Sequence, residues 1–509
     1  MPICGMNVDS REISEHNLFV CKGAAFNPRF LSCARENAAS AYICQADIAD
    51  TLHELEPLMP CIVVSDIRHA MALLAPVIYN HPDNQLYIAG ITGTKGKSST
   101  AYMLRSIMQA AHKPCGIMGS IITDDGIECF ESHNTTPEAP ELWRHLSNMV
   151  QSDRDTMIME VSSQALKYER VLGLDLDVAC FLNIGRDHIS AHEHPDFEDY
   201  FSSKLQIFNQ CTTALINLNS AESDRIYKAA QSAMFPLTYC IKDKHAQNGE
   251  VFHPKADLWA HEIASSNGRV CFKATWNPIA FDSTADPDVR KRVLDASYRS
   301  TPDELVSATF ELGIPGLFNV ENALAAIGMA LLMGIDTQAI SHGLAHVRVP
   351  GRMEIVRSED NHVTAIVDYA HNKLSFETLF ASVKKEYPHH RIISLFGAPG
   401  GKAYERREQL PQIAGVYSDL IIYTEEDPAH DRVEDICNEL AQHTPDTTAY
   451  KIIYNREEAV AFALNEARAS DTDCVVLLLA KGDETRQHRG DEYPLVKSDL
   501  AIAQEILGS

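Results

Sequence analysis

The chain has 509 residues, of which 45% are hydrophobic, so it is long enough for about three domains with cores of their own. It carries 44 Lys and Arg against 70 Asp and Glu, a formal net charge of −26, which excludes a general nucleic-acid binder because such a protein needs a basic face. The first residues begin no signal peptide, the longest apolar run (323–335) is too short for a bilayer, and the 13 cysteines are scattered without a C-x-x-C pair. We therefore expect a cytoplasmic protein with reduced thiols and no membrane contact.

The first 85 residues predict a small α/β unit. Short strands are predicted at 18–20, 41–44 and 61–64, and a helix is predicted over 67–79 because its apolar residues recur at spacings of three and four. The polar segment 80–84 then interrupts the pattern and marks a domain boundary.

A phosphate-binding loop is predicted directly after this boundary. The apolar run 86–92 leads into a glycine-rich turn and an amphipathic helical pattern, the order of elements that binds nucleotide phosphates. Lys97 can reach the terminal phosphates of a bound nucleotide, and the Ser98 hydroxyl can ligate Mg²⁺. Ile91 stands where the common G-x-x-x-x-G-K-[ST] pattern has its first glycine, and a glycine-rich surface turn is the alternative. The residues expected to contact ATP here are Gly93, Thr94, Lys95, Gly96, Lys97, Ser98 and Ser99.

Further strands of the central region, 86–347, end in polar residues. In open α/β sheets, ligands bind beyond the carboxyl ends of the strands, so a carboxylate and an imidazole at these ends indicate chemistry. For His188 a hydrogen-bonded loop histidine is the alternative. A surface excursion is predicted over 282–304 and an apolar helix over 324–332. The strands and their following residues are 156–159 with Glu160, 178–182 with Asn183 and then Asp187-His188, and 214–216 with Asn217.

The third region, 348–509, begins at the break Val349-Pro350-Gly351-Arg352 and alternates strands with helices. This alternation predicts a doubly wound, mostly parallel sheet. Its strands are predicted at 364–367, 392–396, 420–423, 451–454 and 474–479, with helices such as 433–442 and 457–467 between them. Charged or glycine-rich clusters follow four of the strands, at 368–371, 397–402, 425–428 and 481–484.

Several motifs in a fixed order, spread over nearly the whole chain, resemble the Mur ligases. The resemblance implies three α/β domains, each a mainly parallel sheet with flanking helices. These are a uridine-binding domain (1–85), a central P-loop ATPase-like domain (86–347) and a C-terminal doubly wound ligase domain (348–509). The motifs are Thr92-Gly93-Thr94-Lys95-Gly96-Lys97-Ser98, His133-Asn134-Thr135-Thr136-Pro137-Glu138, Met159-Glu160-Val161-Ser162-Ser163-Gln164-Ala165-Leu166, Arg186-Asp187-His188, Phe318-Asn319-Val320-Glu321-Asn322-Ala323, Pro350-Gly351-Arg352-Met353-Glu354 and Asp368-Tyr369-Ala370-His371.

The implied activity is ATP-dependent amide formation in peptidoglycan precursor synthesis, in the branch that adds the third amino acid to UDP-N-acetylmuramoyl-L-alanyl-D-glutamate. The D-glutamate carboxylate attacks the γ-phosphate of ATP and becomes an acyl phosphate, and the incoming amine then displaces phosphate through a tetrahedral intermediate. The protein contributes mainly positioning and charge neutralisation. Members of the family are usually monomers.

By resemblance, the catalytic residues are Lys97, Glu160, His188 and Lys204. Ser98 and Glu160 would hold one Mg²⁺ and His188 a second, since two metals flank the transferred group in the family. From its spacing alone, Lys204 is a helix-surface lysine. The resemblance instead makes it the lysine that CO₂ carboxylates to a carbamate, which then ligates or orients Mg²⁺.

The resemblance also assigns the substrate contacts. Asn319, Asn322, Arg352, Asp368 and His371 would complete the ATP site, with an interdomain salt bridge as the alternative for Arg352. The UDP-sugar peptide would be held by Ser10 at the uridine end and by Thr135, Thr136, Ser162, Gln164 and Arg170. Gln164 replaces the histidine that is common in the family. Family members usually have a few dozen more residues before Asp9-Ser10-Arg11, so either the first element of the uridine domain is missing or the start lies upstream.

The identity of the added amino acid is inferred from one difference between this chain and the family motif. Family members that use meso-diaminopimelate carry Asp-Asn-Pro-Arg where this chain has Glu426-Asp427-Pro428-Ala429. The arginine that grips the extra carboxylate is therefore missing, and the acids there, with Glu484, suit a side-chain ammonium. L-Lysine is favoured. L-Ornithine stays open because a pocket separates one methylene by only about 1–3 kcal/mol, and meso-diaminopimelate is a further alternative. The alternative interpretation is that these acids are solvated residues at strand ends with no functional role.

Two other functions compete with this one. A folate polyglutamate synthetase would share the ATP chemistry, but the Asp-Ser-Arg motif and the segment His133–Glu138 weigh against it. A catalytically inactive nucleotide-binding scaffold is the other alternative. The intact residues Lys97, Ser98, Glu160, His188 and Lys204 weigh against it.

Overall fold

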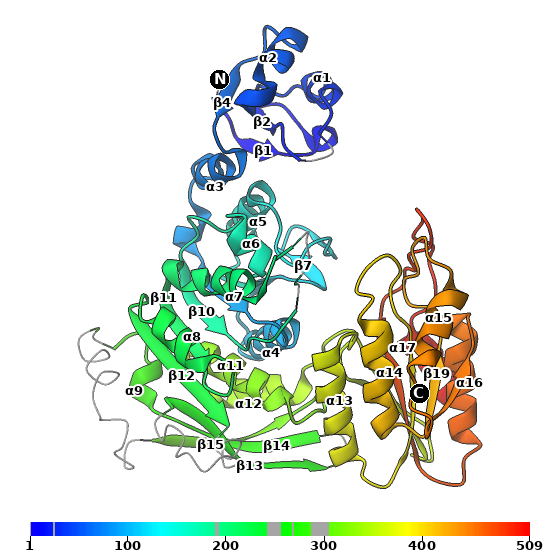
Figure 1. Ribbon diagram of the computed structural model, residues 1–509. Coiled ribbons are helices and arrows are strands. Elements are labelled where there is room, and N and C mark those ends of the chain that lie inside the picture. The colour runs from blue at the N-terminus through cyan, green and yellow to red at the C-terminus, as the bar shows by residue number, and fades with distance from the viewer. Residues whose placement is uncertain are drawn as a thin grey trace. The chain divides into compact units, whose positions relative to one another are not determined.

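A computed structural model (Figure 1) describes residues 2–23, 26–187, 189, 193–241, 256–266, 269–285, 287 and 305–508. The chain divides into two compact units, each described by itself. The first comprises Met1–His261, Ala274–Ala308 and Glu321–Gly343, and the second Glu262–Lys273, Thr309–Val320 and Leu344–Ser509. Within the described ranges, no helix combines the length and the apolar character needed to cross a membrane.

A four-stranded parallel sheet, in the order β1-β2-β3-β4, opens the first unit. The three predicted strands and the predicted helix are all present. The helix α3 begins where the Asp66 carboxylate accepts hydrogen bonds from the backbone N–H groups of Arg68 and His69, a favourable N-cap. The elements are β1 (Gly5–Asn7), η1 (Ser10–Glu12), β2 (Asn17–Val20), α1 (Arg29–Glu36), β3 (Ala41–Gln45), α2 (Ala46–Leu55), β4 (Cys61–Val64), α3 (Ile67–Ile78) and η2 (Pro82–Gln85).

The second sheet has eleven strands in the order β15-β14-β13-β12-β11-β10-β5-β9-β6-β7-β8. From β13 to β6 the neighbouring strands are parallel, and β7 and β8 add an antiparallel edge. The strand before the phosphate loop, β5, lies between β10 and β9. The first half of the elements is β5 (Tyr87–Thr92), α4 (Lys97–Ala110), β6 (Cys115–Met118), β7 (Ile122–Asp124), β8 (Cys129–Glu131), α5 (Ala139–Gln151), β9 (Thr156–Glu160), α6 (Ser163–Lys167), β10 (Leu176–Phe181) and α7 (Phe197–Leu205). The second half is η3 (Gln206–Gln210), β11 (Cys211–Asn217), α8 (Ser223–Ala230), β12 (Phe235–Ile241), β13 (Leu258–Ser266), β14 (Arg269–Trp276), α9 (Pro278–Phe281), β15 (Val306–Leu312), α11 (Asn319–Leu332) and α12 (Thr337–His346).

The third sheet has six strands in the order β16-β17-β21-β18-β19-β20, parallel except for the edge strand β16. Alternate residues of β21 enter two cores. Val475, Leu477 and Leu479 pack with α13, α14 and α15, while Val476 and Leu478 pack with α16 and α17. The predicted doubly wound sheet is therefore confirmed (Figure 1). The elements are β16 (Glu354–Arg357), β17 (Val363–Asp368), α13 (Lys373–Glu386), β18 (Arg391–Phe396), α14 (Arg406–Tyr417), β19 (Leu420–Tyr423), α15 (Val433–Gln442), β20 (Ala449–Ile452), α16 (Arg456–Arg468), β21 (Cys474–Leu479) and α17 (Asp499–Leu507).

Some predicted bounds differ from the structure. β20 ends at Ile452, two residues before the predicted end, because Asn455 already caps α16 by accepting a hydrogen bond from the Glu458 N–H. The helix predicted over 324–332 begins at Asn319, since the motif residues themselves form its first turn. Most of the predicted excursion 282–304 lies outside the described residues. The domain limits at 85 and 347 remain a prediction.

Candidate active site

The phosphate loop follows β5 and is built on two glycines with positive φ, Gly93 (152°) and Gly96 (88°). A side chain at Gly96 would place its Cβ 2.2 Å from the Asn322 Oδ1 atom, so only glycine fits. Asn183, just after the end of β10, fixes the loop through two hydrogen bonds. Its Oδ1 accepts the Lys95 N–H at 2.9 Å and its Nδ2 donates to the Lys95 carbonyl at 3.0 Å. The polar strand end noted in the sequence thus serves to shape the loop.

Two lysine side chains share one carbonyl oxygen of this loop. Lys97 Nζ donates to the Gly93 oxygen at 2.9 Å, and Lys204 Nζ donates to the same atom at 3.0 Å. Lys204 is only 2% exposed, so it is not a helix-surface lysine. Burial, together with the nearby charge of Lys97, lowers the pKa of Lys204 well below its usual value, against the opposing effect of Asp187. A neutral amine is the form that can add CO₂.

Glu160, at the end of β9, is buried next to the loop. The Ser120 backbone N–H donates to its Oε1 at 2.9 Å, and the Ser120 hydroxyl lies 3.3 Å from its Oε2. The Thr135 hydroxyl in turn lies 2.9 Å from the Ser120 Oγ. A Cβ at Gly119 would lie 2.3 Å from the carboxylate, so a side chain there would displace the Glu160 carboxylate. The sequence reasoning missed Ser120, although Gly119-Ser120 follows the end of β6 directly.

The donors near the loop fit magnesium in kind, because Mg²⁺ prefers oxygen ligands. Ser98 lies in the first turn of α4 and Glu160 at the end of the neighbouring strand. His188, the predicted ligand of a second ion, lies outside the described residues. His194 is described and is fully buried, with Nδ1 2.5 Å from Asp199 and Nε2 2.9 Å from the Ser163 hydroxyl. These contacts make it a support of α6 and α7.

Three of the predicted UDP-sugar peptide residues lie together. The Thr136 hydroxyl donates to the Glu160 carbonyl at 2.9 Å and accepts the Ser162 N–H at 3.0 Å, and Arg170 donates to the Thr136 carbonyl at 3.0 Å. The Arg170 guanidinium is also 3.0 Å from Glu138. Thr136 is therefore committed to holding the end of β9, which the sequence did not indicate.

The other residues predicted to contact this substrate make separate contacts. Ser10 is buried in η1, and its carbonyl accepts a hydrogen bond from the Asn37 side chain at 2.9 Å. Gln164, at the start of α6, donates to Glu193 at 3.3 Å. A missed cation, Lys22, forms an ion pair with Glu138. It adds a positive charge next to Arg170.

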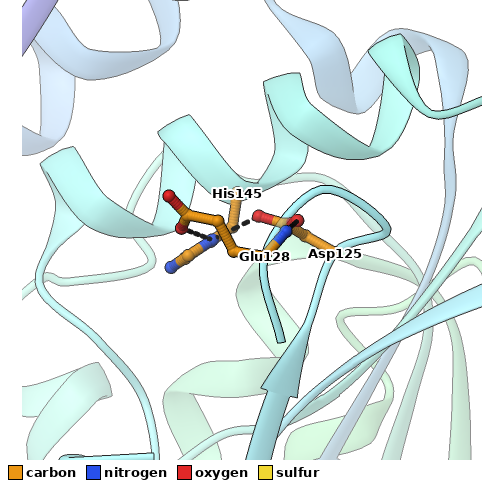
Figure 2. A group of neighbouring side chains, drawn as sticks. All are labelled: Asp125, Glu128 and His145. Carbon is orange, nitrogen blue, oxygen red and sulfur yellow. Dashed lines mark hydrogen bonds and ion pairs between the residues drawn. The ribbon is translucent and has the colours of Figure 1, made fainter. Parts of the chain in front are cut away.

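A cluster of Asp125, Glu128 and His145 has metal-like spacing (Figure 2). His145 Nδ1 is 2.6 Å from Asp125 Oδ2, which Asn148 also contacts at 2.8 Å, while the backbone N–H groups of residues 127 and 128 donate to Oδ1. Burial alone would raise the pKa of Asp125, but the hydrogen bonds from His145 and the backbone lower it to about 2. Because both carboxylate oxygens already accept hydrogen bonds, the cluster is an internal brace between α5 and the β7–β8 turn.

In the second unit, Asp368 at the end of β17 holds two loops. Its Oδ1 accepts the Ala370 N–H at 2.7 Å and its Oδ2 accepts the Met353 N–H at 2.9 Å. The Arg352 guanidinium lies over the Tyr369 ring, 4.5 Å from its centre. These contacts fix the geometry of the segment that carries Arg352.

Two more predicted ATP contacts belong to this unit. His371 Nδ1 is 2.6 Å from the Tyr369 carbonyl, and the buried Asn319 side chain donates to the Pro315 carbonyl at 2.7 Å. Both side chains are thereby oriented by nearby backbone.

The predicted acidic amino-acid site is not uniformly acidic, which corrects the sequence analysis. Lys481 is 2.9 Å from Asp427 and 2.6 Å from Glu484, so the two acids share one internal cation. Arg489 makes a two-point ion pair with Glu425, at 2.6 and 3.1 Å. These partners come from the segment after β21.

Glu426 remains as the distinctive acid. It is 8% exposed, and within the described part of the chain its Oε2 atom has no hydrogen-bond partner. Burial raises its pKa to about 7, although the charges of Arg406, Arg456 and Lys481 oppose the shift. Such a carboxylate is complementary to a cationic ligand group.

The loop around Glu426 is tightly packed. A Cβ at Gly400 would lie 1.8 Å from the Pro428 carbonyl, and the Gly400 N–H donates to the Asp427 carbonyl at 2.9 Å. Ala429 has a positive φ of 49°, and its N–H donates to the His488 carbonyl at 3.1 Å. Hydrogen bonds therefore join the segments that follow β18, β19 and β21.

Comparison with known proteins shows the family of this chain. The Mur ligase middle domain matches residues 91–330, and the Mur ligase glutamate ligase domain matches residues 351–482. The UDP-N-acetylmuramyl-tripeptide synthetase of Lactobacillus delbrueckii subsp. bulgaricus is 32% identical to this chain, covering 99% of the chain and 93% of that protein. The chain belongs to the Mur ligase family.

Other Mur ligases are similar over the same length. The UDP-N-acetylmuramoyl-L-alanyl-D-glutamate--L-lysine ligase of Enterococcus faecalis is 31% identical, covering 99% of this chain and 92% of that protein. The solved structure of a UDP-N-acetylmuramoyl-L-alanyl-D-glutamate--2,6-diaminopimelate ligase superposes with a TM-score of 0.64 at 21% identity, covering 100% of this chain and 95% of that one. The latter likeness concerns the fold alone. The resemblance and the predicted fold class are confirmed.

Proposed function

We propose that this Mur ligase joins L-lysine to the D-glutamate of UDP-N-acetylmuramoyl-L-alanyl-D-glutamate and converts ATP to ADP and phosphate. It would do so in the cytoplasm and as a monomer. Similarity to tripeptide synthetases over almost the entire chain supports the reaction. The loop with Gly93, Gly96 and Lys97 at the start of α4 supports ATP as the phosphate donor.

The chemistry would begin at the phosphate loop. Backbone N–H groups of the loop and Lys97 would hold the β- and γ-phosphates while the D-glutamate carboxylate attacks the γ-phosphorus. Ser98 and Glu160 would hold one Mg²⁺ and His188 a second, and the ions would neutralise the developing charge. Asn319, Asn322, Arg352, Asp368 and His371 would contribute further ATP contacts.

Lys204 would act as a carbamate. Its buried amine lies next to Lys97 and has a lowered pKa, and conversion to an anion would place an attractive charge next to Lys97, where a protonated amine would be repelled. A carbamate also offers oxygen atoms, the donors that Mg²⁺ prefers.

The UDP-sugar peptide would lie along Ser10, Thr135, Ser162, Gln164 and Arg170. Arg170 and Lys22 supply positive charge there, which suits a diphosphate or carboxylate. Thr136 would act indirectly, through its hydrogen bond to the end of β9.

The observation that carries the choice of lysine is the buried Glu426 carboxylate with an unpartnered oxygen. A lysine ε-ammonium would supply the missing hydrogen bond and a compensating charge. Asp427, Pro428, Ala429 and Glu484 would shape the pocket around it, and no arginine at position 429 competes with the ammonium.

Phosphate release tests the reaction and the amino acid together. The purified chain is incubated with ATP, Mg²⁺ and UDP-MurNAc-L-Ala-D-Glu, and L-lysine, L-ornithine and meso-diaminopimelate are compared. Release that requires both the nucleotide dipeptide and L-lysine is expected. Release with diaminopimelate only would contradict the lysine assignment, a preference for ornithine would place the pocket one methylene shorter, and no release at all would favour an inactive scaffold.

Replacing Ala429 by arginine should weaken the use of L-lysine by about tenfold or more in kcat/KM, because a second cation next to Glu426 competes with the ammonium. The measurement is the kcat/KM ratio for L-lysine and meso-diaminopimelate. Ala469→Arg, which adds the same charge at an exposed helix end, is the matched control. Equal lysine kinetics in both variants would mean that the selectivity pocket lies elsewhere.

A further inference from the structure

A cavity of about 470 Å³ lies in the second unit, next to the predicted amino-acid site. The end of β19, the start of α16 and the segment 487–497 form its wall. Three cationic side chains line it, and each is paired with a carboxylate: Arg456 with Asp499, Arg489 with Glu425 and Lys497 with Glu505. Guanidinium and ammonium groups gathered around one cavity are the donors that an anion needs. We infer that this cavity binds a small organic carboxylate.

The first support is a polar group without a partner. Gln487 lines the cavity and is 1% exposed. Within the described ranges, its Nε2 atom makes no hydrogen bond. A buried donor left unsatisfied costs free energy, and a carboxylate oxygen in the cavity is the acceptor that would satisfy it.

The second support is the arrangement of the charges. Arg489 contacts Glu425 through Nε and Nη2 only, so Nη1 takes no part in that pair. Lys497 is 2.9 Å from Glu505 and 3.7 Å from Glu457, and its side chain is half exposed. The cavity also adjoins the N-terminus of the thirteen-residue helix α16, whose backbone dipole favours an anion.

The third support is the apolar part of the wall, which Leu495 and Val496 provide. It suits the carbon chain of an organic acid better than an inorganic ion. Two sources share this chemistry, namely the α-carboxylate of the amino-acid substrate and a free dicarboxylate. The experiment separates them.

The cavity is tied to the predicted amino-acid site by backbone hydrogen bonds. Between Gln487 and Arg489, the His488 N–H donates to Asp427 at 3.0 Å and the His488 carbonyl accepts the Ala429 N–H at 3.1 Å. An occupant of the cavity would therefore contact the segment that holds the loop after β19. The inference goes beyond the proposed reaction, and of its two sources only the amino-acid carboxylate rests on the proposed function.

The test is calorimetric titration of the full chain with glutarate, a dicarboxylate without an ammonium group, against sodium chloride of equal ionic strength. Gln487→Met should raise the Kd for glutarate at least about tenfold, because a hydrogen bond to a charged group is lost. Its melting temperature without ligand should not fall, since the replaced donor had no partner. Gln442→Met, at the exposed end of α15, should leave the Kd unchanged.

Two further ligands, L-lysine and cadaverine, identify the source of the carboxylate. They also distinguish a failure of this inference from a failure of the proposed function. If the site takes the carboxylate of the amino acid, Gln487→Met weakens L-lysine but not cadaverine, which is lysine without its carboxylate. If only glutarate is weakened, the ligand is a free dicarboxylate. Glu426→Gln should affect cadaverine and leave glutarate unchanged. No binding of glutarate to the unmodified chain, or equal binding to Gln487→Met, would overturn the inference.

Discussion

Glu426→Gln should abolish most use of L-lysine and at the same time stabilise the protein above neutral pH. The amide keeps the size of the side chain but removes the charge that would pair with the ε-ammonium. We expect kcat/KM for L-lysine to fall roughly a hundredfold, since a buried ammonium would lose its ionic partner. Phosphate release at saturating ATP and nucleotide dipeptide measures the loss.

The stability effect has a defined sign. Burial raises the pKa of Glu426 to about 7 in the folded chain, whereas an unfolded glutamate titrates near its ordinary value. The folded state therefore holds the proton more tightly, and stability falls as the pH rises from that ordinary value to about 7. Above that pH the ionised carboxylate costs about 3 kcal/mol, a cost that glutamine does not carry.

Hydrogen exchange in β19 and β21, measured at pH 5 and pH 8, tests this expectation. The variant should be more protected than the unmodified chain at pH 8 and nearly equal at pH 5. Glu408→Gln, an exposed glutamate on α14, is the matched control and should change neither protection nor lysine use. Undiminished lysine kinetics in Glu426→Gln would remove Glu426 from the substrate site.

Lysine binding by the unmodified chain should also depend on pH. Below about pH 7 the Glu426 carboxyl is protonated, so binding of an ammonium must first displace a proton. The KM for L-lysine should consequently fall as the pH rises toward 7 and level off above it.

Lys204→Ala should lower turnover by about a thousandfold or more, a loss typical of removing a group that orients the transferred phosphoryl. The alanine variant leaves space where the carbamate would lie, so added acetate or propionate should restore part of the activity. Lys204→Arg carries a fixed positive charge and cannot form the carbamate, so it should be as inactive as the alanine variant. Lys228→Ala, an exposed lysine on α8, is the control.

A second readout does not depend on activity. Carbon NMR of the full chain in ¹³C-bicarbonate should show a carbamate signal that is absent from Lys204→Ala and present in Lys228→Ala. Normal turnover of Lys204→Ala, or an identical carbamate signal in both variants, would contradict the assignment of Lys204.

Local patterns determined much of the fold. The phosphate loop and α4 could be predicted because an apolar strand, a glycine turn and a helical period of apolar residues follow each other directly. The strands β17, β18, β19 and β21 were equally readable, since parallel strands buried on both faces give short continuous apolar runs. The strands β12 to β15, on one side of the second sheet, were missed. Their composition mixes polar and apolar residues, so no continuous apolar run marks them.

The amino-acid sequence by itself also placed the candidate residues on the strand ends and, through its motifs, indicated the family. Only the tertiary structure decided what surrounds each of them. The sequence pattern indicated that Asp427 and Glu484 are free acids, whereas in the structure Lys481 contacts both. The spacing alone indicated that Lys204 is a surface lysine, whereas its amine donates a hydrogen bond to the Gly93 carbonyl. The reason is physical. Burial and long-range pairing set the charge state of a side chain, and both depend on groups that are distant in the chain and meet only when it folds.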